Sequence, residues 1–376
     1  MKIGLIRRGY SETGGAERYL LRFADGLEAL GHSCVLFSDR LWPVEVWKDR
    51  EAKVVKHARS PGAFADSLEQ MNPGKHCDFL FSLERVWGCD CYRAGDGVHA
   101  AWLDRRAAFE AKWRGLARGL NSKHRELIAL ERALYSPESR THIIANADFI
   151  RKEIQHYYRT PDDRITVIHN GFDPPDLDAA ARARLRDKGR AAHAIGPDTV
   201  VFLFVGSGWE RKGLAQAIRA VERLSEEGND VRLLVAGRDK GAPDTRVPSL
   251  TWFLGPASAT ELAMLYETAD VFLLPTWYDP FSNASLEAAG HGLPVVTTVS
   301  NGICELWPDL EGSVVSSPED PGLVDACRTW LDPEPRLAAR PRNRAACALH
   351  SVAKNVQRSL DLFARLTGGA PAETAG

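Results

Sequence analysis

Short apolar runs alternate along the chain with segments whose apolar residues recur at helical spacing. The run KIGLI at residues 2–6 opens the chain, and a helical pattern follows in which Leu20, Ala24 and Leu27 share one face. Gly31 follows this pattern, where the end of a helix favours glycine. Further apolar runs occupy residues 33–38, 77–84 and 141–146. Strands that alternate with helices predict right-handed crossovers and a parallel sheet.

A second series of the same kind begins at residue 199. Its predicted strands are short and apolar throughout, which is typical of strands that are covered on both faces. They occupy residues 199–206, 231–237, 250–255, 270–275 and 294–298, with helical patterns after the first strand, at 259–269 and at 283–292. We therefore predict an α/β protein with two doubly wound, Rossmann-like parallel-sheet domains.

The pattern breaks between the two series. An apolar strand ends at Asn170–Gly171, two prolines follow, and a charged segment rich in Ala and Arg covers residues 179–194. Such a break is typical of a domain boundary. We predict an N-terminal domain of residues 1–172 and a C-terminal domain of residues 173–351. A last helix at about 352–366 is expected to pack back on the first domain.

Composition narrows the class of protein. With 376 residues, 44% of them hydrophobic and 26% charged, the chain suffices for two globular domains. Because the formal net charge is only -2, we expect no nucleic-acid partner. The seven scattered cysteines favour reduced thiols, and their spacing does not fit a zinc site. No apolar run approaches the roughly 18 residues of a membrane span, so we expect a soluble or peripherally attached protein.

Ligands of open parallel sheets bind beyond the carboxyl ends of the strands, so the strand-to-helix loops are the candidate site. The first such loop, GYSETGGAER, carries Gly14 and Gly15 just before a predicted helix. Glycine allows the backbone to approach a ligand closely, and a helix N-terminus offers N–H groups to an anion. A flexible turn accounts for these glycines equally well.

The second loop, GSGWERKG, follows the strand at 199–206. A P-loop would need Lys and Ser or Thr after the glycine, where this chain has Leu214 and Ala215. What remains is Arg211 beside Lys212. Two adjacent cations between a strand and a helix suit a diphosphate, since Arg supplies a planar fork and Lys a point charge. The alternative is a solvated charged turn.

The third loop lies in LLPTWYDPFSNASLEAAGHGLPVV. Asp279 follows the strand, and Ser282 begins a predicted helix whose first N–H groups would face the ligand, those of Asn283, Ala284 and Ser285. Glu287 lies one turn further on, where its carboxylate can accept hydrogen bonds from the two vicinal hydroxyls of a ribose. Its apolar neighbours argue for a role, because burying a charge is costly. The alternative is a glutamate on the helix surface.

Together the GG loop, the motif V-G-x-x-x-x-R-K-G and the run D-P-F-S-N-A-S-L-E-A-A-G-H-G-L-P-V-V-T-T resemble the GT-B retaining glycosyltransferases of family 4. The resemblance spans residues 1–365 and implies two domains that face each other across a cleft. It further implies transfer of a hexose from a UDP-sugar with retention of configuration and without a metal ion or other cofactor. The segment CDCYRAGDGVHAAWLDRR is similar to that of members that glucosylate a lipopolysaccharide core.

The resemblance also implies roles for individual residues. Arg211 and Lys212 would hold the donor diphosphate, and Glu287 would bind the ribose. Asp279 would hold the donor sugar together with the backbone of Phe281, Ser282, Asn283, Ala284 and Ser285. Gly14 and Gly15 would admit the phosphate from the first domain. Asp96 would lie at the reacting centre, with His99 as the alternative. Asp279 and Ser282 stand where the family usually has Glu and Gly, so the donor sugar stays open.

The segment 102–132 combines aromatic and basic residues. On one predicted helical face lie Trp102, Phe109, Trp113, Leu116 and Leu120, and beside them Arg105, Arg106 and Arg114. This pattern is typical of a helix that lies on an anionic membrane. It would equally suit a phosphorylated, lipid-linked glycan acceptor. We expect a cytoplasmic protein on the inner face of the plasma membrane; the alternative is an amphipathic helix packed on its own domain.

Three other functions compete with this one. UDP-N-acetylglucosamine 2-epimerases share the two-domain fold. A catalytically silent sugar-nucleotide-binding subunit of a glycan assembly complex would keep the same donor residues. A dehydrogenase is disfavoured, because the first strand-to-helix turn lacks G-x-G-x-x-G.

Overall fold

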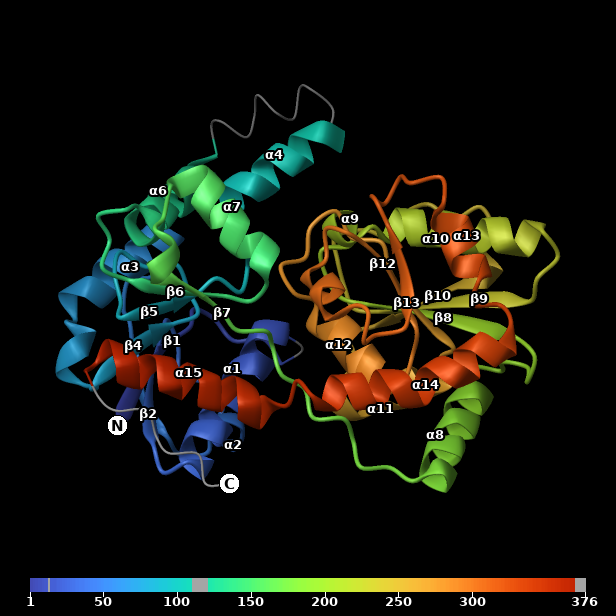
Figure 1. The fold of residues 1–376 in the computed structure, drawn as a ribbon, viewed down its shortest axis with the longest axis horizontal. Coiled ribbons are helices and arrows are strands. Elements are labelled where there is room, and N and C mark those ends of the chain that lie inside the picture. Colours follow the sequence, from blue (N-terminus) through green and yellow to red (C-terminus); the bar gives the residue numbers. More distant parts are fainter. Residues whose placement is uncertain (13, 110–120, 369–376) are drawn as a thin grey trace. The chain divides into compact units, whose positions relative to one another are not determined.

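The computed structural model describes residues 1–12, 14–109 and 121–368 and divides the chain into two compact units (Figure 1). Unit 1 comprises Met1–Gly171 together with the C-terminal segment from Val352, and unit 2 comprises Phe172–Ser351. The chain thus passes between the units twice, after Gly171 and before Val352. Among the helices of the described ranges, none combines the length and the apolar character that a membrane span requires.

In the residues described, unit 1 contains a seven-stranded parallel sheet in the order β3-β2-β1-β4-β5-β6-β7. Its strands are β1 (Lys2–Ile6), β2 (Ser33–Ser38), β3 (Glu51–Val54), β4 (Phe79–Ser82), β5 (Cys91–Arg93), β6 (His142–Ala145) and β7 (Ile165–Val167). Its helices are α1 (Gly15–Ala29), α2 (Val44–Trp47), α3 (Pro61–Gln70), α4 (His99–Phe109), α6 (Ser122–Tyr135), α7 (Asp148–Tyr158) and α15 (Val352–Leu366).

Unit 2, which is described throughout, contains a six-stranded parallel sheet in the order β10-β9-β8-β11-β12-β13. Its strands are β8 (Val200–Val205), β9 (Val231–Ala236), β10 (Thr251–Gly255), β11 (Val271–Leu274), β12 (Val295–Thr298) and β13 (Gly312–Val315). Its helices are α8 (Ala179–Ala192), α9 (Trp209–Lys212), α10 (Leu214–Glu226), α11 (Ala259–Thr268), α12 (Asn283–Gly290), α13 (Leu323–Arg328) and α14 (Pro333–Ala348).

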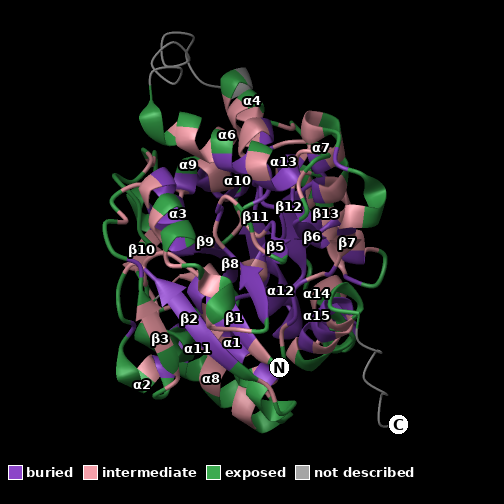
Figure 2. Cartoon of the chain, turned by 90° about the vertical axis from the view of Figure 1, so that its left-hand side faces the viewer, coloured by how far each residue is buried: buried purple, intermediate pink, exposed green. Residues whose placement is uncertain are grey.

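Burial accounts for the strands that the apolar pattern identified. Every residue of the central strands β4, β8, β11 and β12 is buried, and Figure 2 shows strands such as β8 and β11 in the colour of buried residues. The edge strands β3 and β13 are partly exposed and therefore lack a continuous apolar run. The two doubly wound sheets confirm the predicted fold class.

Helix α15 packs on the first unit. Tyr19 of α1 donates a hydrogen bond from its hydroxyl to Oδ1 of Asn355 over 2.9 Å. The ring of Phe363 lies 4.3 Å from that of Phe79 in β4, centroid to centroid. A Cβ placed on Gly26 would lie 2.7 Å from Cγ2 of Val356, so this glycine gives α15 its close approach to α1.

The charged segment at 179–194, which marked the break between the two series, lies within the second unit. It forms helix α8 inside unit 2, and Asp178 caps the helix by accepting a hydrogen bond from the N–H of Ala181 over 2.6 Å. Alanine and arginine are both strong helix formers, so a charged run without a continuous apolar face can be helical here.

Candidate functional site

The site of unit 2 lies where the strand order reverses. Strands β8 and β11 are neighbours, but their connections continue to opposite sides of the sheet, towards β9 and β12. At such a point the two connections run in opposite directions and leave a crevice for a ligand beyond the carboxyl ends of the strands. Arg211 and Lys212 follow β8, and Asp279 follows β11. The topology therefore brings together the two charged motifs, although they are far apart in the sequence.

Lys212 and Asp279 form a buried ion pair in unit 2. The ammonium Nζ of Lys212 lies 3.2 Å from Oδ2 of Asp279, and the two side chains are only 12% and 10% exposed. Burial lowers the pKa of Lys212, and the charge of Asp279 partly opposes that shift. For Lys212 the alternative of a solvated turn is therefore wrong, because its side chain is largely removed from water at the edge of the sheet.

Arg211 fastens its own loop to the loop after β11. Its guanidinium Nη1 donates to the backbone carbonyl of Tyr278. Its backbone carbonyl accepts hydrogen bonds from the N–H of Trp277 over 2.8 Å and from the hydroxyl of Thr276 over 3.0 Å. Gly213 makes this approach feasible, because it has φ +75° and a Cβ there would lie 1.9 Å from the carbonyl oxygen of Pro275.

The first turn of α12 differs from the prediction in one respect. The hydroxyl of Ser282 caps the helix by accepting a hydrogen bond from the N–H of Ser285 over 3.1 Å. That N–H is therefore used within the protein and does not face a ligand, contrary to the prediction. The N–H groups of Asn283 and Ala284 keep their place in the first turn, where a helix lacks intrahelical acceptors.

Glu287 is buried in the second turn of α12. This residue is only 4% exposed, so the alternative of a glutamate on the helix surface is wrong. The hydroxyl of Tyr266 donates to its Oε2 over 3.2 Å. This hydrogen bond fixes the direction of the carboxylate and stabilises its charge in an apolar environment.

Asn301, which sequence reasoning missed, organises the loops around Asp279. This residue is 1% exposed. Its Nδ2 donates to the hydroxyls of Ser285 and Thr297 over 3.2 and 3.1 Å. Its Oδ1 accepts from the N–H groups of Ser282 and Ile303 over 3.2 and 3.3 Å. One amide thus joins the loop after β12 to the start of α12.

We expect Asn301→Ala to destabilise unit 2 by about 2 to 4 kcal/mol, because the buried groups that Asn301 satisfies would lose their partner. Urea unfolding followed by fluorescence measures the change. Val299→Ala, two residues away and 60% exposed, is the matched control, and its midpoint should stay at the wild-type value. Equal midpoints for the two variants would contradict this role of Asn301.

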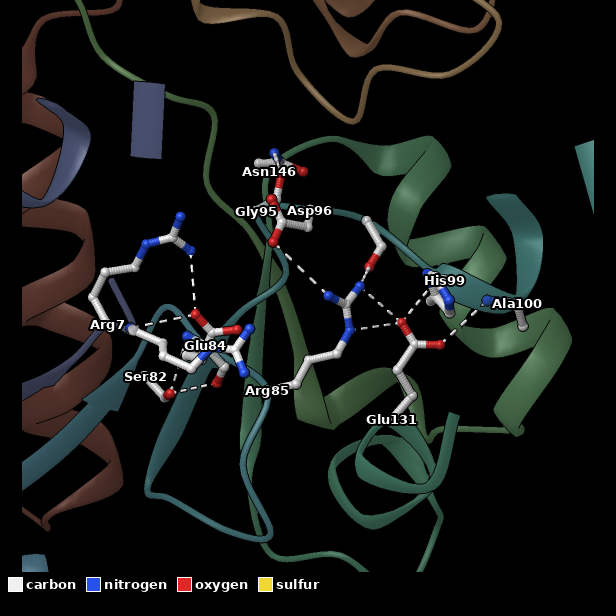
Figure 3. A network of polar contacts seen from close by, with 12 residues as sticks. Arg7, Ser82, Glu84, Arg85, Gly95, Asp96, His99, Ala100, Glu131 and Asn146 are labelled. Carbon is white, nitrogen blue, oxygen red and sulfur yellow. Dashed lines mark hydrogen bonds and ion pairs between the residues drawn. The ribbon is translucent and has the colours of Figure 1, made fainter. Parts of the chain in front are cut away.

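The corresponding edge of unit 1 carries a second charged network (Figure 3). Arg7 follows β1, and its guanidinium lies 3.0 Å from Oε1 of Glu17 and 3.4 Å from Oε2 of Glu84. Glu84 follows β4, and burial raises the pKa of its carboxyl group. Since β1 and β4 adjoin where the order of this sheet reverses, the network lies at the first unit's own candidate ligand position.

Gly14 precedes α1 and serves the same network. A Cβ on Gly14 would lie 1.8 Å from Oε2 of Glu17, so the missing side chain makes room for a carboxylate at the helix N-terminus. A negative charge is favourable at that end of a helix. The predicted phosphate contact of Gly14 and Gly15 stays a prediction.

Arg85 connects Asp96 with the interior of unit 1 (Figure 3). Its Nε donates to Oε1 of Glu131 over 2.9 Å, and its Nη2 donates to the carbonyl of Gly97 over 2.9 Å. Its Nη1 lies 3.8 Å from Oδ2 of Asp96, whose side chain is 59% exposed. Strand β5 ends at Arg93, so Asp96 stands in the following loop with its carboxylate near the surface.

His99 begins helix α4, and Glu131 holds that helix end. Oε1 of Glu131 accepts from the N–H of His99 over 2.6 Å, and Oε2 accepts from the N–H of Ala100 over 3.3 Å. Nε2 of His99 lies 2.9 Å from Nδ1 of His124. Burial, with the charges of Arg85 and His124, lowers the pKa of His99 to about 3, so its imidazole is neutral near pH 7.

The aromatic and basic segment is only partly described. Trp102, Arg105 and Arg106 lie on α4, Phe109 is its last residue, and Trp113 and Arg114 lie outside the described residues. Nη2 of Arg105 lies 2.7 Å from Oε1 of Glu153 in α7. The predicted helical face from Trp102 to Leu120 continues into residues outside the described ranges and stays a prediction; beyond them, Asn121 is extended and caps a separate helix, α6.

Some of the site residues that the sequence analysis missed could have been found from their position in the sequence, and others could not. Glu84 is the last residue of the predicted strand at 77–84 and Arg85 directly follows it, so the rule that ligands bind at the carboxyl ends of strands indicates both. Glu131 and Asn301 carry no local signal, because their roles depend on partners far along the chain.

In the ranges that are described, no three His, Cys, Asp or Glu side chains group closely enough to hold a metal ion. None of the seven cysteines forms a disulfide.

The two units are open, doubly wound α/β sheets with charged loops at their reversal points, where proteins of this class bind their ligands. The family model described as "Glycosyltransferase Family 4" matches residues 13–175, and the one described as "Glycosyl transferases group 1" matches residues 199–332. Together the matches cover most of the chain. The chain belongs to the family 4 glycosyltransferases, whose two domains these models describe, and it has the GT-B fold.

Individual relatives agree with this assignment. The lipopolysaccharide glucosyltransferase WaaG of Escherichia coli is 26% identical over 325 residues, which are 82% of this chain and 83% of that protein. The crystal structure of WaaG aligns with a TM-score of 0.78 and 24% identity over 98% of this chain and 100% of that one. Anabaena Alr3699/HepE, solved with UDP-glucose, aligns with a TM-score of 0.72 and 16% identity over 97% and 100%.

Other matches are partial. The uncharacterized glycosyltransferase MJ1607 of Methanocaldococcus jannaschii is 28% identical over 191 residues, which are 48% of this chain and 48% of that protein. The chain likewise spans about half the length of other curated relatives that it matches.

Proposed function

We propose that this protein is a retaining hexosyltransferase that moves glucose from UDP-glucose to a lipopolysaccharide-core or related envelope glycan. The observation that carries the proposal is the buried pair of Lys212 and Asp279 beside Arg211, at the reversal point of the second sheet. The similarity to WaaG and to a protein solved with UDP-glucose supports this choice of donor and acceptor.

The chemistry would proceed on the loops of unit 2. The acceptor hydroxyl forms a bond with the anomeric carbon while the bond from that carbon to the UDP oxygen breaks. The departing diphosphate gains negative charge, which Arg211 and Lys212 would stabilise. A preorganised donor of this kind contributes about 2.7 to 4 kcal/mol to transition-state stabilisation. Because both groups are partly withdrawn from water, their charges act at a lower effective dielectric constant than at the surface.

Retention of configuration would follow if attack and departure occur on the same face of the sugar, with a phosphate oxygen of UDP taking the acceptor proton. Arg211 and Lys212 supply two positive charges at the diphosphate position, the charge that a divalent cation provides in other enzymes. We therefore propose that transfer needs no metal ion.

The remaining site residues would position the two substrates. Glu287, directed by Tyr266, would accept hydrogen bonds from the two ribose hydroxyls. Asp279 would bind hydroxyls of the donor sugar while it keeps Lys212 charged. In unit 1, Asp96 would meet the acceptor hydroxyl, and neutral His99 is the alternative partner.

Lys212→Met should weaken UDP binding by roughly ten- to a hundredfold, because a charge-assisted hydrogen bond to the diphosphate is lost. Isothermal titration calorimetry with UDP measures the effect. Lys188→Met, on the exposed side of α8, is the control and should bind UDP as the wild type does. Wild-type affinity in Lys212→Met would contradict the proposed diphosphate contact.

The same titration has an expected pH dependence. Because the pKa of Lys212 is lowered in the free protein, this side chain loses its proton at a lower pH than an ordinary lysine. UDP requires the protonated form, so affinity should fall as the pH rises through that lowered pKa. Lys212→Arg should remain flat over the same range, since a guanidinium stays protonated. Identical profiles for the wild type and this variant would count against the assignment.

A transfer assay tests the whole proposal. UDP-glucose labelled with ¹³C at the anomeric carbon is incubated with a lipopolysaccharide-core acceptor, with and without EDTA, and the product linkage is identified by NMR. An α-linked product in both samples supports the proposal. Free epimerised sugar nucleotide would indicate an epimerase, and donor binding without turnover over an acceptor panel would indicate a non-catalytic subunit.

We also propose that the segment around α4 contacts an anionic membrane on the cytoplasmic side of the plasma membrane. Changing Arg105, Arg106 and Arg114 to Gln should weaken binding to phosphatidylglycerol vesicles by roughly a hundredfold, at about 1 kcal/mol per cation. Gln is chosen because Glu at position 105 would repel Glu153. Sedimentation with vesicles measures the loss, and UDP affinity should not change. Arg223→Gln, on the surface of unit 2, is the control, and unchanged sedimentation of the triple variant would remove this hypothesis.

A further inference from the structure

A second cluster of cations lies in unit 2, outside the donor loops. Helices α8 and α14 each present three arginines at four-residue spacing, which places each set on one helical face. They are Arg182, Arg186 and Arg190 on α8, and Arg336, Arg340 and Arg344 on α14. Arg186 of α8 and Arg340 of α14 both donate hydrogen bonds to carbonyls at the C-terminal end of α11, so both helices approach that end (Figure 1).

The cluster lies at the opposite edge of the sheet from the donor loops. Asp270, which the arginines share, immediately precedes β11, and its Oδ2 accepts a hydrogen bond from the N–H of Val201 in β8 over 2.9 Å. These are the amino ends of the two strands, whereas Arg211 and Lys212 follow the carboxyl end of β8. An anion held by this cluster would therefore be separate from a diphosphate at the donor loops.

Part of the cluster has an evident structural role. Arg186 donates to the carbonyls of Thr268 and Ala269 over 3.1 Å each and to Oδ1 of Asp270 over 2.7 Å. Arg340 also donates to the carbonyl of Ala269, over 3.0 Å. Cations are favourable at a helix C-terminus, so these contacts fasten α8 and α14 to α11.

The positive charge nevertheless exceeds what the contacts neutralise. Among the described residues, Glu267 and Asp270 are the carboxylates that form ion pairs with these six arginines, and Glu267 is also 2.8 Å from His291. The charge of Asp332 further favours the cation of Arg336. Burial and neighbouring arginines lower the pKa of Arg190, Arg336, Arg340 and Arg344.

Two of the six guanidinium groups have no acceptor among the described residues. Within the part of the chain that the structure describes, Arg336 and Arg344 form no hydrogen bond or ion pair, and Nη1 of Arg336 is buried without a partner. A buried donor without an acceptor is destabilising, and so is an excess of like charges. Both costs would be relieved by one anion that accepts hydrogen bonds from several guanidinium groups.

We infer that the face between α8 and α14 binds a small phosphate-bearing anion. Phosphate offers several charged oxygens, and the planar fork of arginine matches two of them at once. The cluster consists of arginines without a lysine, which favours such bidentate recognition over simple charge attraction. Arg336 and Arg344 supply the uncommitted N–H groups. The charge of Arg186 acts on Arg336, and the charge of Arg182 acts on Arg344.

Thermal unfolding with inorganic phosphate as the probe tests this inference. In phosphate-free buffer of constant ionic strength, added phosphate should raise the Tm of the wild type saturably. Arg336→Gln/Arg344→Gln should have a Tm equal to or above that of the wild type without phosphate, because unsatisfied like charges are removed. Its affinity for phosphate should be at least about tenfold weaker.

Two control variants distinguish this cluster from the exposed arginines of α14 and from the donor loops. Arg342→Gln removes an arginine of α14 that is 66% exposed and paired with Glu311, and it should keep the phosphate response. Lys212→Met should also keep it, because the donor loops are not involved.

Several results would overturn the inference. They are a wild type without a saturable response, a response that survives in the double variant, and a response that disappears in Lys212→Met. A double variant with a lower Tm in phosphate-free buffer would show that these side chains only hold the helices together.

Discussion

The arrangement of unit 2 depends on the ion pair between Lys212 and Asp279. A lysine ammonium withdrawn from water is costly unless a carboxylate compensates it, and here the compensating group comes from a different loop. The pair can form only if the loops after β8 and β11 meet at the reversal point of the sheet. Gly213 permits that approach, and Asn301 holds the neighbouring loop in place. The requirements of one charged pair thus account for several residues that are not themselves charged.

Unit 1 also has paired charges at the carboxyl edge of its sheet, but there carboxylates compensate the arginines more fully. Arg7 is paired with Glu17 and Glu84, and Arg85 is paired with Glu131 and approaches Asp96. These cations are compensated within the protein. Such an edge suits a ligand that presents hydroxyl groups, as the proposed glycan acceptor does. The edge of unit 2, where Arg211 lies beside the ion pair of Lys212 and Asp279, suits a more negative ligand.

The sequence predicted those parts of the fold whose signals are local. The apolar runs at 2–6 and 33–38 coincide with β1 and β2, because every residue of these strands after the first is buried. The edge strand β3 was missed, because it is partly exposed and polar. Helix α6, which begins after the capping residue Asn121, was not predicted as a separate element, because its sequence continues the aromatic and basic segment at 102–132.

For the site, too, the sequence predicted what depends on local signals and missed what depends on distant partners. The charged residues after β8 and β11 were identified from their position, and the structure brings Lys212 and Asp279 together. The N–H of Ser285 was assigned to the ligand, but the neighbouring hydroxyl of Ser282 takes it. Glu131 and Asn301 could not be predicted, because their partners come from other elements of the fold. Only the three-dimensional structure reveals such long-range hydrogen bonds.

A crystal structure of the complex with UDP tests the central claim most directly. The account predicts diphosphate oxygens at hydrogen-bond distance, about 3 Å, from both the guanidinium of Arg211 and the ammonium of Lys212. A diphosphate that is bound elsewhere, with these two side chains directed away from it, would contradict the account.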